Sequence, residues 1–140
     1  MVADIAYLQQ NPQDLSHLDR LLAIQRAAFR ADPLPSAAQR RTWLTALRLL
    51  LVQEQDAIAE AISRDFGNRS ADETRMAEIM PSILGIHYAS RRLKKWMKPS
   101  RRAVGLPFQP ASTRVIYQPL GVVGVIVPWN YPLFLAIGPL

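Results

Sequence analysis

The stretch from Pro119 to Leu140 constrains the fold of this chain more than any other part of its sequence. Its 22 residues carry no charged side chain, and a hydropathy window would score such a stretch as a membrane-spanning helix. Seven of the 22 are proline or glycine, and they are spread throughout. A helix in lipid with so many breaks would leave backbone N–H and C=O groups without partners. The stretch is therefore predicted to contain a buried strand and a tight turn, and no membrane span.

The residues before this stretch have the periodicity of amphipathic helices. Apolar residues recur at helical spacing up to Phe29, after a predicted N-cap at Asn11. A capping-box pattern at residues 36–39 predicts a second helix, which continues to Phe66 and ends at Gly67. Because neither helix is apolar on all sides, each must cover another helix or a sheet.

A third helix is predicted from a second capping-box pattern, residues 70–73, to Trp96. Its apolar residues keep one helical phase across Pro81, so a kinked helix is favoured over two separate ones. His87 belongs to that face, and we expect a core or boundary histidine rather than a metal ligand. The residues of the face are Met76, Met80, Ile83, His87, Leu93 and Met97.

The pattern changes after Pro99, and seven of the eleven prolines fall from Pro99 to Pro139. Thr113–Gln118 and Leu120–Val127 have the β-branched and apolar composition of strands. The predicted fold class is therefore α/β, with a sheet that is incomplete in this chain. Its parts are a helical region over 1–98, a Pro- and Arg-rich connection over 99–112, and a strand pair with a turn over 113–140.

Seven basic residues and no acid lie between Arg91 and Arg102. Without them the chain has 10 basic and 11 acidic residues, so the net charge of +6 comes from this one cluster. Such a cluster could bind nucleic acid or an anionic membrane. Cations at the carboxyl end of a helix also offset the helix dipole, and we favour this interpretation. The cluster consists of Arg91, Arg92, Lys94, Lys95, Lys98, Arg101 and Arg102.

The absence of cysteine excludes several kinds of site from these 140 residues. Disulfides, thiolate zinc sites and a cysteine nucleophile are all ruled out. His17 and His87 are far apart in the sequence, so we predict no metal site. Met1–Asn11 holds an acid and no basic residue, which is unlike a signal peptide and predicts a cytoplasmic protein. The final residues are apolar, and this suggests a fragment of something longer.

The turn Val127–Pro132 is the best candidate for a functional segment. It follows an apolar run and presents a tryptophan and an asparagine between two prolines. Prolines stiffen the backbone, which is one way to hold a site residue in place. Asn130 could donate its amide to a developing oxyanion. A simpler interpretation is that Asn130 only forms the turn and that Trp129 only fills the core. From the spacing alone, we favour this second interpretation.

The segment Pro119–Pro132, PLGVVGVIVPWNYP, closely resembles the corresponding segment of the NAD(P)-dependent aldehyde dehydrogenase superfamily. Shorter matches in the helical region look most like its class 3-like branch and, within that branch, bacterial coniferyl aldehyde dehydrogenases. The resemblance covers about residues 18–140. The shorter matches are residues 25–29, 65–70, 73–74, 77–79 and 96–99.

This resemblance implies an activity and a set of site residues. Members oxidise an aldehyde to a carboxylic acid through a cysteine thiolate and pass a hydride to a nicotinamide. By analogy, Asn130 donates its amide to the oxyanion beside the nucleophile, and the helices belong to the cofactor-binding domain. The strands from Thr113 start in or near the oligomerisation sheet of a homodimer or larger homo-oligomer. The residues that match the cleft for NAD or NADP are Ile126, Val127, Pro128, Trp129 and Asn130.

The rest of the family's catalytic machinery lies downstream of the matched segment. The cysteine, the glutamate base, the cofactor-binding lysine and the glycine-rich cofactor turn are not among these 140 residues. We therefore interpret the chain as the N-terminal segment of an oxidoreductase that oxidises coniferyl or another aromatic aldehyde with NAD or NADP. The segment is expected to be inactive alone and to have no nucleic-acid or membrane partner. Two alternatives stay open. One is a helical module that binds anions through Arg91–Arg102, and the other is a truncated paralogue that acts in subunit contacts.

Overall fold

The computed structural model describes residues 12–140, and side chains from residue 16 onward. These residues form two compact units, each described here by itself. Among the described residues, the first unit contains 12–34 together with 118–124, and the second contains 35–117 together with 125–140. No helix in the described part of the chain is both long enough and apolar enough to cross a membrane.

The first unit is built on helix α2 (Pro12–Ala31). The helix ends just before Asp32-Pro33, as the sequence predicted, whereas the predicted N-cap Asn11 lies outside the described residues. Gly121 faces Phe29 of this helix, and a Cβ at Gly121 would lie 3.4 Å from Cε1 of the ring. That distance is an ordinary van der Waals contact, whereas the φ of Gly121 is +104°, a conformation that residues with a side chain rarely adopt, and this explains a glycine here.

The second unit begins with helices α3 (Ala37–Gln53) and α4 (Gln55–Phe66). Ser36 caps α3 as predicted, because its Oγ accepts a hydrogen bond from the Gln39 N–H at 3.2 Å. The prediction of one helix up to Phe66 was wrong, since the chain leaves helical geometry at Glu54, with φ −98° and ψ 12°. This break redirects α4 so that its apolar face packs against the next helical segment. Gly67 ends α4 in the left-handed conformation, as predicted.

The predicted third helix is continuous across Pro81 but contains a wider turn. It consists of α5 (Ala71–Thr74), the π-turn η1 (Arg75–Ile79) and α6 (Met80–Trp96). Proline lacks an N–H and its ring crowds the preceding turn, and the extra residue of a π-turn gives it room. The predicted capping box at Ser70 was wrong, because the Ser70 side chain makes no capping hydrogen bond.

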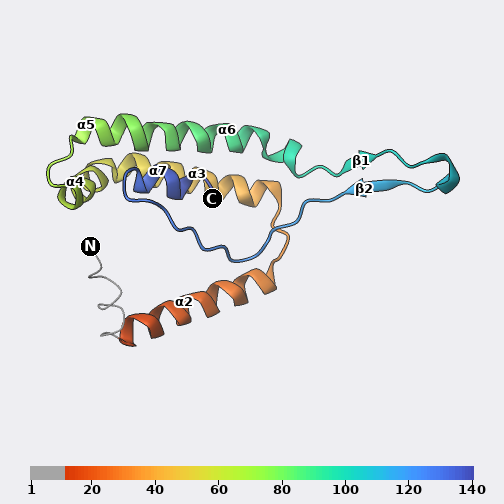
Figure 1. Cartoon of the computed structure of the whole chain (residues 1–140), viewed down its shortest axis with the longest axis horizontal. Helices are drawn as coiled ribbons and strands as arrows, with labels where there is room; N and C mark the ends of the chain where they lie inside the picture. Colours follow the sequence, from red (N-terminus) through yellow and green to blue (C-terminus); the bar gives the residue numbers. More distant parts are fainter. Residues whose placement is uncertain (1–11) are drawn as a thin grey trace. The chain divides into compact units, whose positions relative to one another are not determined.

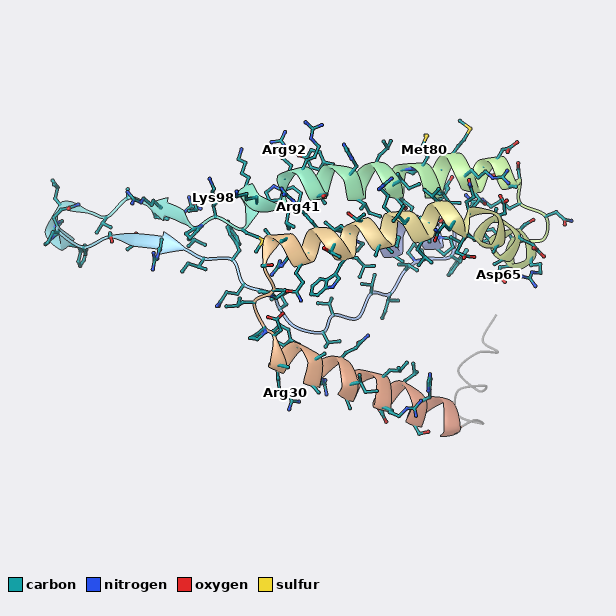
Figure 2. All side chains as sticks on the ribbon, turned by 180° about the vertical axis from the view of Figure 1, so that it is seen from behind. Arg30, Arg41, Asp65, Met80, Arg92 and Lys98 are labelled. Atoms are coloured by element: carbon teal, nitrogen blue, oxygen red, sulfur yellow. The ribbon has the colours of Figure 1, made fainter. Side chains whose placement is uncertain are left out.

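The buried face of this long helix differs from the predicted one. Met76 and Met80, which were predicted to lie on that face, are 67% and 50% exposed. His87 is exposed as well, so the prediction of a core or boundary histidine was wrong. Met80 projects from the side of α6 that faces away from α3 (Figure 2). The π-turn adds a residue and so rotates the apolar face relative to a regular helix. The buried residues are Thr74, Glu78, Ile79, Ser82 and Ile86.

Helices α3 and α6 lie side by side and antiparallel, with α4 turned across their end (Figure 1). Nε of Arg41 in α3 donates a hydrogen bond to the carbonyl of Ser90 in α6 at 3.2 Å. The apolar core is small for a chain of this length. Among the described residues it consists of Leu51, Ala59, Ile62, Ile79 and Ile86.

An antiparallel hairpin follows α6 (Figure 1). Strand β1 (Ser100–Arg102) lies in the predicted connection and pairs with β2 (Thr113–Val115), around the short 3-10 helix η2 (Leu106–Phe108). The α/β class is thus confirmed, with far more helix than sheet. The second predicted strand, Leu120–Val127, does not form, because no strand in the described part of the chain is available to pair with it.

Candidate functional site

The predicted turn leads directly into a short helix. Residues 127–131, hereafter the bend, are followed by α7 (Pro132–Ile137), with Pro132 at its first position. Proline favours that position because its missing N–H is not needed there. No side chain within the bend caps α7. The first N–H groups of this helix therefore depend on a partner from elsewhere in the fold.

That partner is the carboxylate of Glu78. Its Oε2 accepts hydrogen bonds from the N–H groups of Leu133, at 2.8 Å, and Phe134, at 3.2 Å. Glu78 has no exposed surface. It lies 55 residues away from Leu133 in the sequence. An ionised carboxylate is well placed at a helix N-terminus, where the orphan N–H groups and the helix dipole favour negative charge.

Arg69 joins Glu78 to the bend. Its Nη1 donates to Glu78 Oε1 and to the main-chain carbonyl of Asn130, both at 2.9 Å. The guanidinium carbon lies 5.3 Å from the ring centroid of Phe66 and 4.7 Å from that of Tyr131. The Arg69 side chain is only 6% exposed, so this ion pair is shielded from water. Here the pair Arg69–Glu78 is named the clamp.

Local structure explains how the clamp residues reach the bend. Gly67 and Asn68 both have positive φ, of 65° and 80°, which ends α4 and turns the chain back at Arg69. Glu78 lies in the π-turn η1, and its carbonyl accepts a hydrogen bond from Ser82 Oγ at 2.6 Å. The two charged groups thus come from positions fixed by a helix end and by an irregular helical turn.

A second, exposed ion-pair group links α4 to the π-turn. Arg75 Nη2 donates to Asp56 Oδ1 at 2.9 Å, and Nη1 donates to Asp72 Oδ1 at 3.1 Å. The hydrogen bond with Asp56, supported by that with Asp72, holds the pKa of Arg75 above its ordinary value, although desolvation opposes the shift. Since the pKa is raised on folding, this stabilisation is fully present at neutral pH and is lost only as the pH rises through the folded-state value.

The predicted cofactor and catalytic residues lie in the bend and directly before it, and most of them are exposed. Ile126 is 100% exposed and Trp129 is 80% exposed. Pro128 and Asn130 are also exposed, and Val127 is half-buried. The structure holds the carbonyl of Asn130, through Arg69, while none of the described residues hydrogen-bonds to its carboxamide. The roles assigned to these five residues remain predictions.

Sequence reasoning missed the clamp entirely. Glu78 and Arg69 both stand in segments that carry the family resemblance, but no role followed from it. A signal was available for Glu78, which is the only charged residue between Arg75 and Arg91. Its partner could not be found in this way, because the contact requires α4, η1 and the bend to be placed in space.

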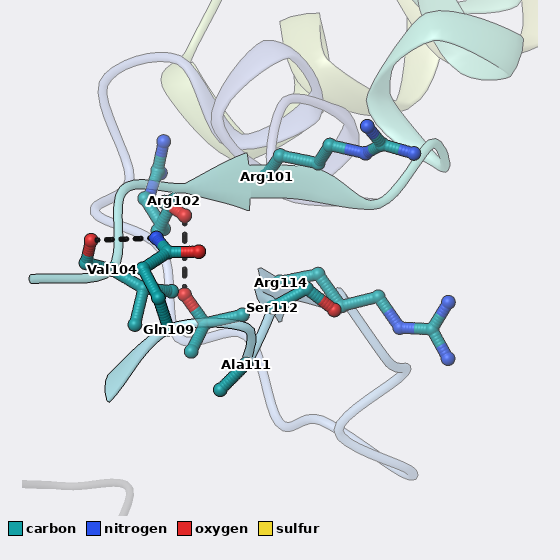
Figure 3. Close-up of a pocket in the computed structure, with 8 residues that line it drawn as sticks. Arg101, Arg102, Val104, Gln109, Ala111, Ser112 and Arg114 are labelled. Carbon is teal, nitrogen blue, oxygen red and sulfur yellow. Dashed lines mark hydrogen bonds between the residues drawn. The ribbon is translucent and has the colours of Figure 1, made fainter. Parts of the chain in front are cut away.

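The basic cluster lies at the carboxyl end of α6 and on the hairpin, and all seven of its residues are exposed. Lys94 and Lys95 occupy the last turn of α6, where positive charge offsets the helix dipole. On the hairpin, Arg101 pairs directly with Arg114 across the strands. Both arginines line a hollow of about 570 Å³ together with Gln109 and Thr113. Figure 3 draws the two arginine side chains on the facing strands.

Comparison with known proteins identifies relatives over nearly the whole chain. The model of the aldehyde dehydrogenase family matches residues 6–140. The chain is 71% identical, over all its 140 residues, to a probable coniferyl aldehyde dehydrogenase from Pseudomonas aeruginosa, of which it covers 29%. It is 45% identical over 91 residues, or 65% of its length, to a coniferyl aldehyde dehydrogenase from a Pseudomonas species, of which the match covers 18%.

A more distant relative is the aldehyde dehydrogenase family 3 member B1 of Rattus norvegicus. It is 36% identical over 115 residues, which are 82% of this chain and 24% of the rat protein. The chain thus spans less than a third of the length of each of these relatives.

Proposed function

Because this chain belongs to the aldehyde dehydrogenase family, we propose that it is the N-terminal segment of an enzyme that oxidises an aldehyde to a carboxylic acid with NAD or NADP. The resemblance to the class 3-like branch and its coniferyl aldehyde dehydrogenases is confirmed by the relatives. Two of them are named for coniferyl aldehyde, so an aromatic aldehyde of that kind is the proposed substrate. With no cysteine, the segment alone is expected to be inactive.

The bend would supply the electrophilic part of the site. As a nucleophile attacks the aldehyde, its carbonyl oxygen gains negative charge, and the carboxamide of Asn130 donates an N–H to that oxygen. One such donor contributes about 3 kcal/mol to the stability of the transition state. The observation that carries the proposal is that this carboxamide is exposed on a bend whose main chain is anchored at Asn130.

The surface next to Asn130 fits the nicotinamide part of a cofactor. Ile126, Pro128 and Trp129 form an exposed strip without charge, and a flat aromatic ring packs well on such side chains. These residues, with Val127, would hold the ring beside the Asn130 carboxamide. The chemistry that NAD or NADP supplies when bound is acceptance of a hydride.

The same proposal includes a homo-oligomer in the cytoplasm, where free NAD and NADP are found, without nucleic-acid or membrane partners. In the described part of the chain, β1 and β2 pair only with each other. Strand edges of this kind commonly pair with further strands, either of the same subunit or of another. The anion-binding alternative finds no support in the named functions of the relatives.

A chimera tests this function. The chain replaces the matching 140 residues of the Pseudomonas aeruginosa relative, and formation of reduced nicotinamide is followed with coniferyl aldehyde and NAD or NADP. We expect the chimera to be active and Asn130→Ala to lower kcat by about 10²- to 10³-fold, because the oxyanion loses a donor.

The matched control is Gln53→Ala, which removes an exposed carboxamide from α3, away from the bend. It should leave kcat unchanged. Circular dichroism and oligomer size should be the same for both variants. An inactive chimera contradicts the proposed activity, and normal turnover in Asn130→Ala contradicts the role of Asn130.

A further inference from the structure

The clamp places two opposite charges where an apolar pair would be easier to accommodate. Glu78 is fully buried and the Arg69 side chain is 6% exposed. Removing such charges from water costs several kcal/mol per ion, and well-packed apolar residues often serve stability equally well. In addition, Nε of Arg69 is buried without a hydrogen-bond partner among the described residues. Fold stability alone therefore explains the clamp poorly.

The contacts of the clamp converge on the bend and the start of α7. Arg69 binds the carbonyl of Asn130 and stacks on the ring of Tyr131. Glu78 binds the N–H groups of Leu133 and Phe134. The clamp thus touches four of the five residues from 130 to 134, including those on both sides of Pro132.

The six-residue helix α7 cannot hold the bend in place without such contacts. A helix this short is unstable on its own, because nucleation fixes several residues for few hydrogen bonds. The carboxamide of Asn130 has no partner of its own among the described residues, so the place from which it can act depends on the main chain from which it branches. That main chain is fixed at the carbonyl of Asn130 by Arg69.

We propose that Arg69 and Glu78 are positioning residues, which aim the Asn130 carboxamide at the reacting carbonyl oxygen by holding the main chain of residues 130–134. This inference rests on the proposed function of Asn130. Catalytic groups must be held to within about 0.5 Å, and displacement by about 1 Å can cost on the order of 10² in rate. The clamp would provide that accuracy without touching the substrate.

The test uses Glu78→Gln in the chimera, because glutamine keeps the shape but removes the charge that pairs with Arg69. We expect kcat to fall by about 10- to 100-fold, with little change in KM for the aldehyde, since substrate contacts are unaltered. The matched control is Glu73→Gln. Glu73 lies 3.2 Å from Arg69 Nη2, but its side chain is 51% exposed and has no recorded contact with the bend. Its replacement should change kcat by less than about twofold.

A double-mutant cycle separates positioning from general destabilisation. If Glu78 acts through Asn130, then Asn130→Ala with Glu78→Gln should be about as slow as Asn130→Ala alone. If the two losses multiply, or if Glu78→Gln turns over normally, the proposal is wrong. Should Glu78→Gln not fold, Arg69→Lys enters the same cycle, because it keeps the charge beside Glu78 but loses the planar group between Phe66 and Tyr131.

Hydrogen exchange provides a readout that does not need activity. The amides of Leu133 and Phe134 should exchange faster in Glu78→Gln than in the unmutated chimera, and at the unmutated rate in Glu73→Gln. Unchanged exchange in Glu78→Gln would overturn the proposal. If the unmutated chimera is inactive, the proposed function fails, and the exchange rates still decide whether the clamp holds the bend.

Discussion

At the scale of single residues, the path from α4 to the clamp depends on backbone conformations that few residues adopt. Gly67 and Asn68 both have positive φ, and Arg69 follows immediately. The Asn68 N–H donates to the carbonyl of Ser63 at 2.9 Å, which closes the end of α4. The sequence predicted the stop at Gly67, because glycine is the usual residue in the left-handed conformation, whereas the positive φ of Asn68 was not predicted.

Gly67→Ala tests this dependence. A Cβ at Gly67 meets no atom within 4 Å, so the cost comes from φ of +65° alone. We expect the variant of the chimera to lose about 1 kcal/mol of stability, measured by chemical denaturation. The matched control is Gly85→Ala in α6, where space is also open and no positive φ is recorded. There alanine should leave stability equal or higher, and a loss as large as at Gly67 would contradict the explanation.

The candidate site could be predicted from sequence only in part. Asn130 and its neighbours stand in one contiguous motif, so the sequence was enough to select them. Arg69 and Glu78 contact that motif from positions 61 and 55 residues away along the chain. No local pattern indicates a contact at such separation, because it depends on where α4 and η1 lie after folding.

At the scale of elements, helix ends followed local rules and helix interiors did not. The ends of α2, α3 and α4 lie at the predicted proline, serine and glycine signals. The break at Glu54 carries no comparable signal, and Pro81 predicts a distortion of the long helix but does not specify the π-turn η1. Both adjust the direction or rotation of a helix so that its apolar face meets the core, and this requirement comes from packing.

The two predicted serine caps offer an internal comparison. Ser36 binds the N–H of Gln39, whereas Ser70 makes no capping hydrogen bond with its side chain. Ser36→Ala should therefore destabilise the chimera by about 1 kcal/mol, and Ser70→Ala should cost clearly less. Urea unfolding of the two variants measures the difference. Equal losses of stability in the two variants would show that the capping hydrogen bond of Ser36 does not stabilise the protein.

The prediction of a strand at Leu120–Val127 was wrong because it, too, depended on contacts with other parts of the chain. Its composition is that of a strand, but a strand is completed by pairing, and the described part of the chain offers only β1 and β2, which pair with each other. Composition indicates what a segment can form, whereas the partner decides what it does form.

At the scale of the whole molecule, the described residues bury few apolar side chains and leave many large ones exposed. Ile126 and Trp129 are nearly free of contacts, and five apolar residues make up the buried core of the described part. The segment covers 29% of its Pseudomonas aeruginosa relative. We therefore expect much of this surface, including the strip along the bend, to be covered in a polypeptide of the full family length.

The 80% exposure of Trp129 gives the bend an optical reporter. Indole emission depends on its surroundings, so a dinucleotide seated on the strip should quench the part of the chimera's fluorescence that disappears in Trp129→Phe. Titration with NAD should show this quenching in the parent and in Trp43→Phe, which removes the indole of α3 instead. Equal quenching in Trp129→Phe would place the dinucleotide elsewhere. Binding of the dinucleotide to the strip can thus be measured by fluorescence before any turnover occurs.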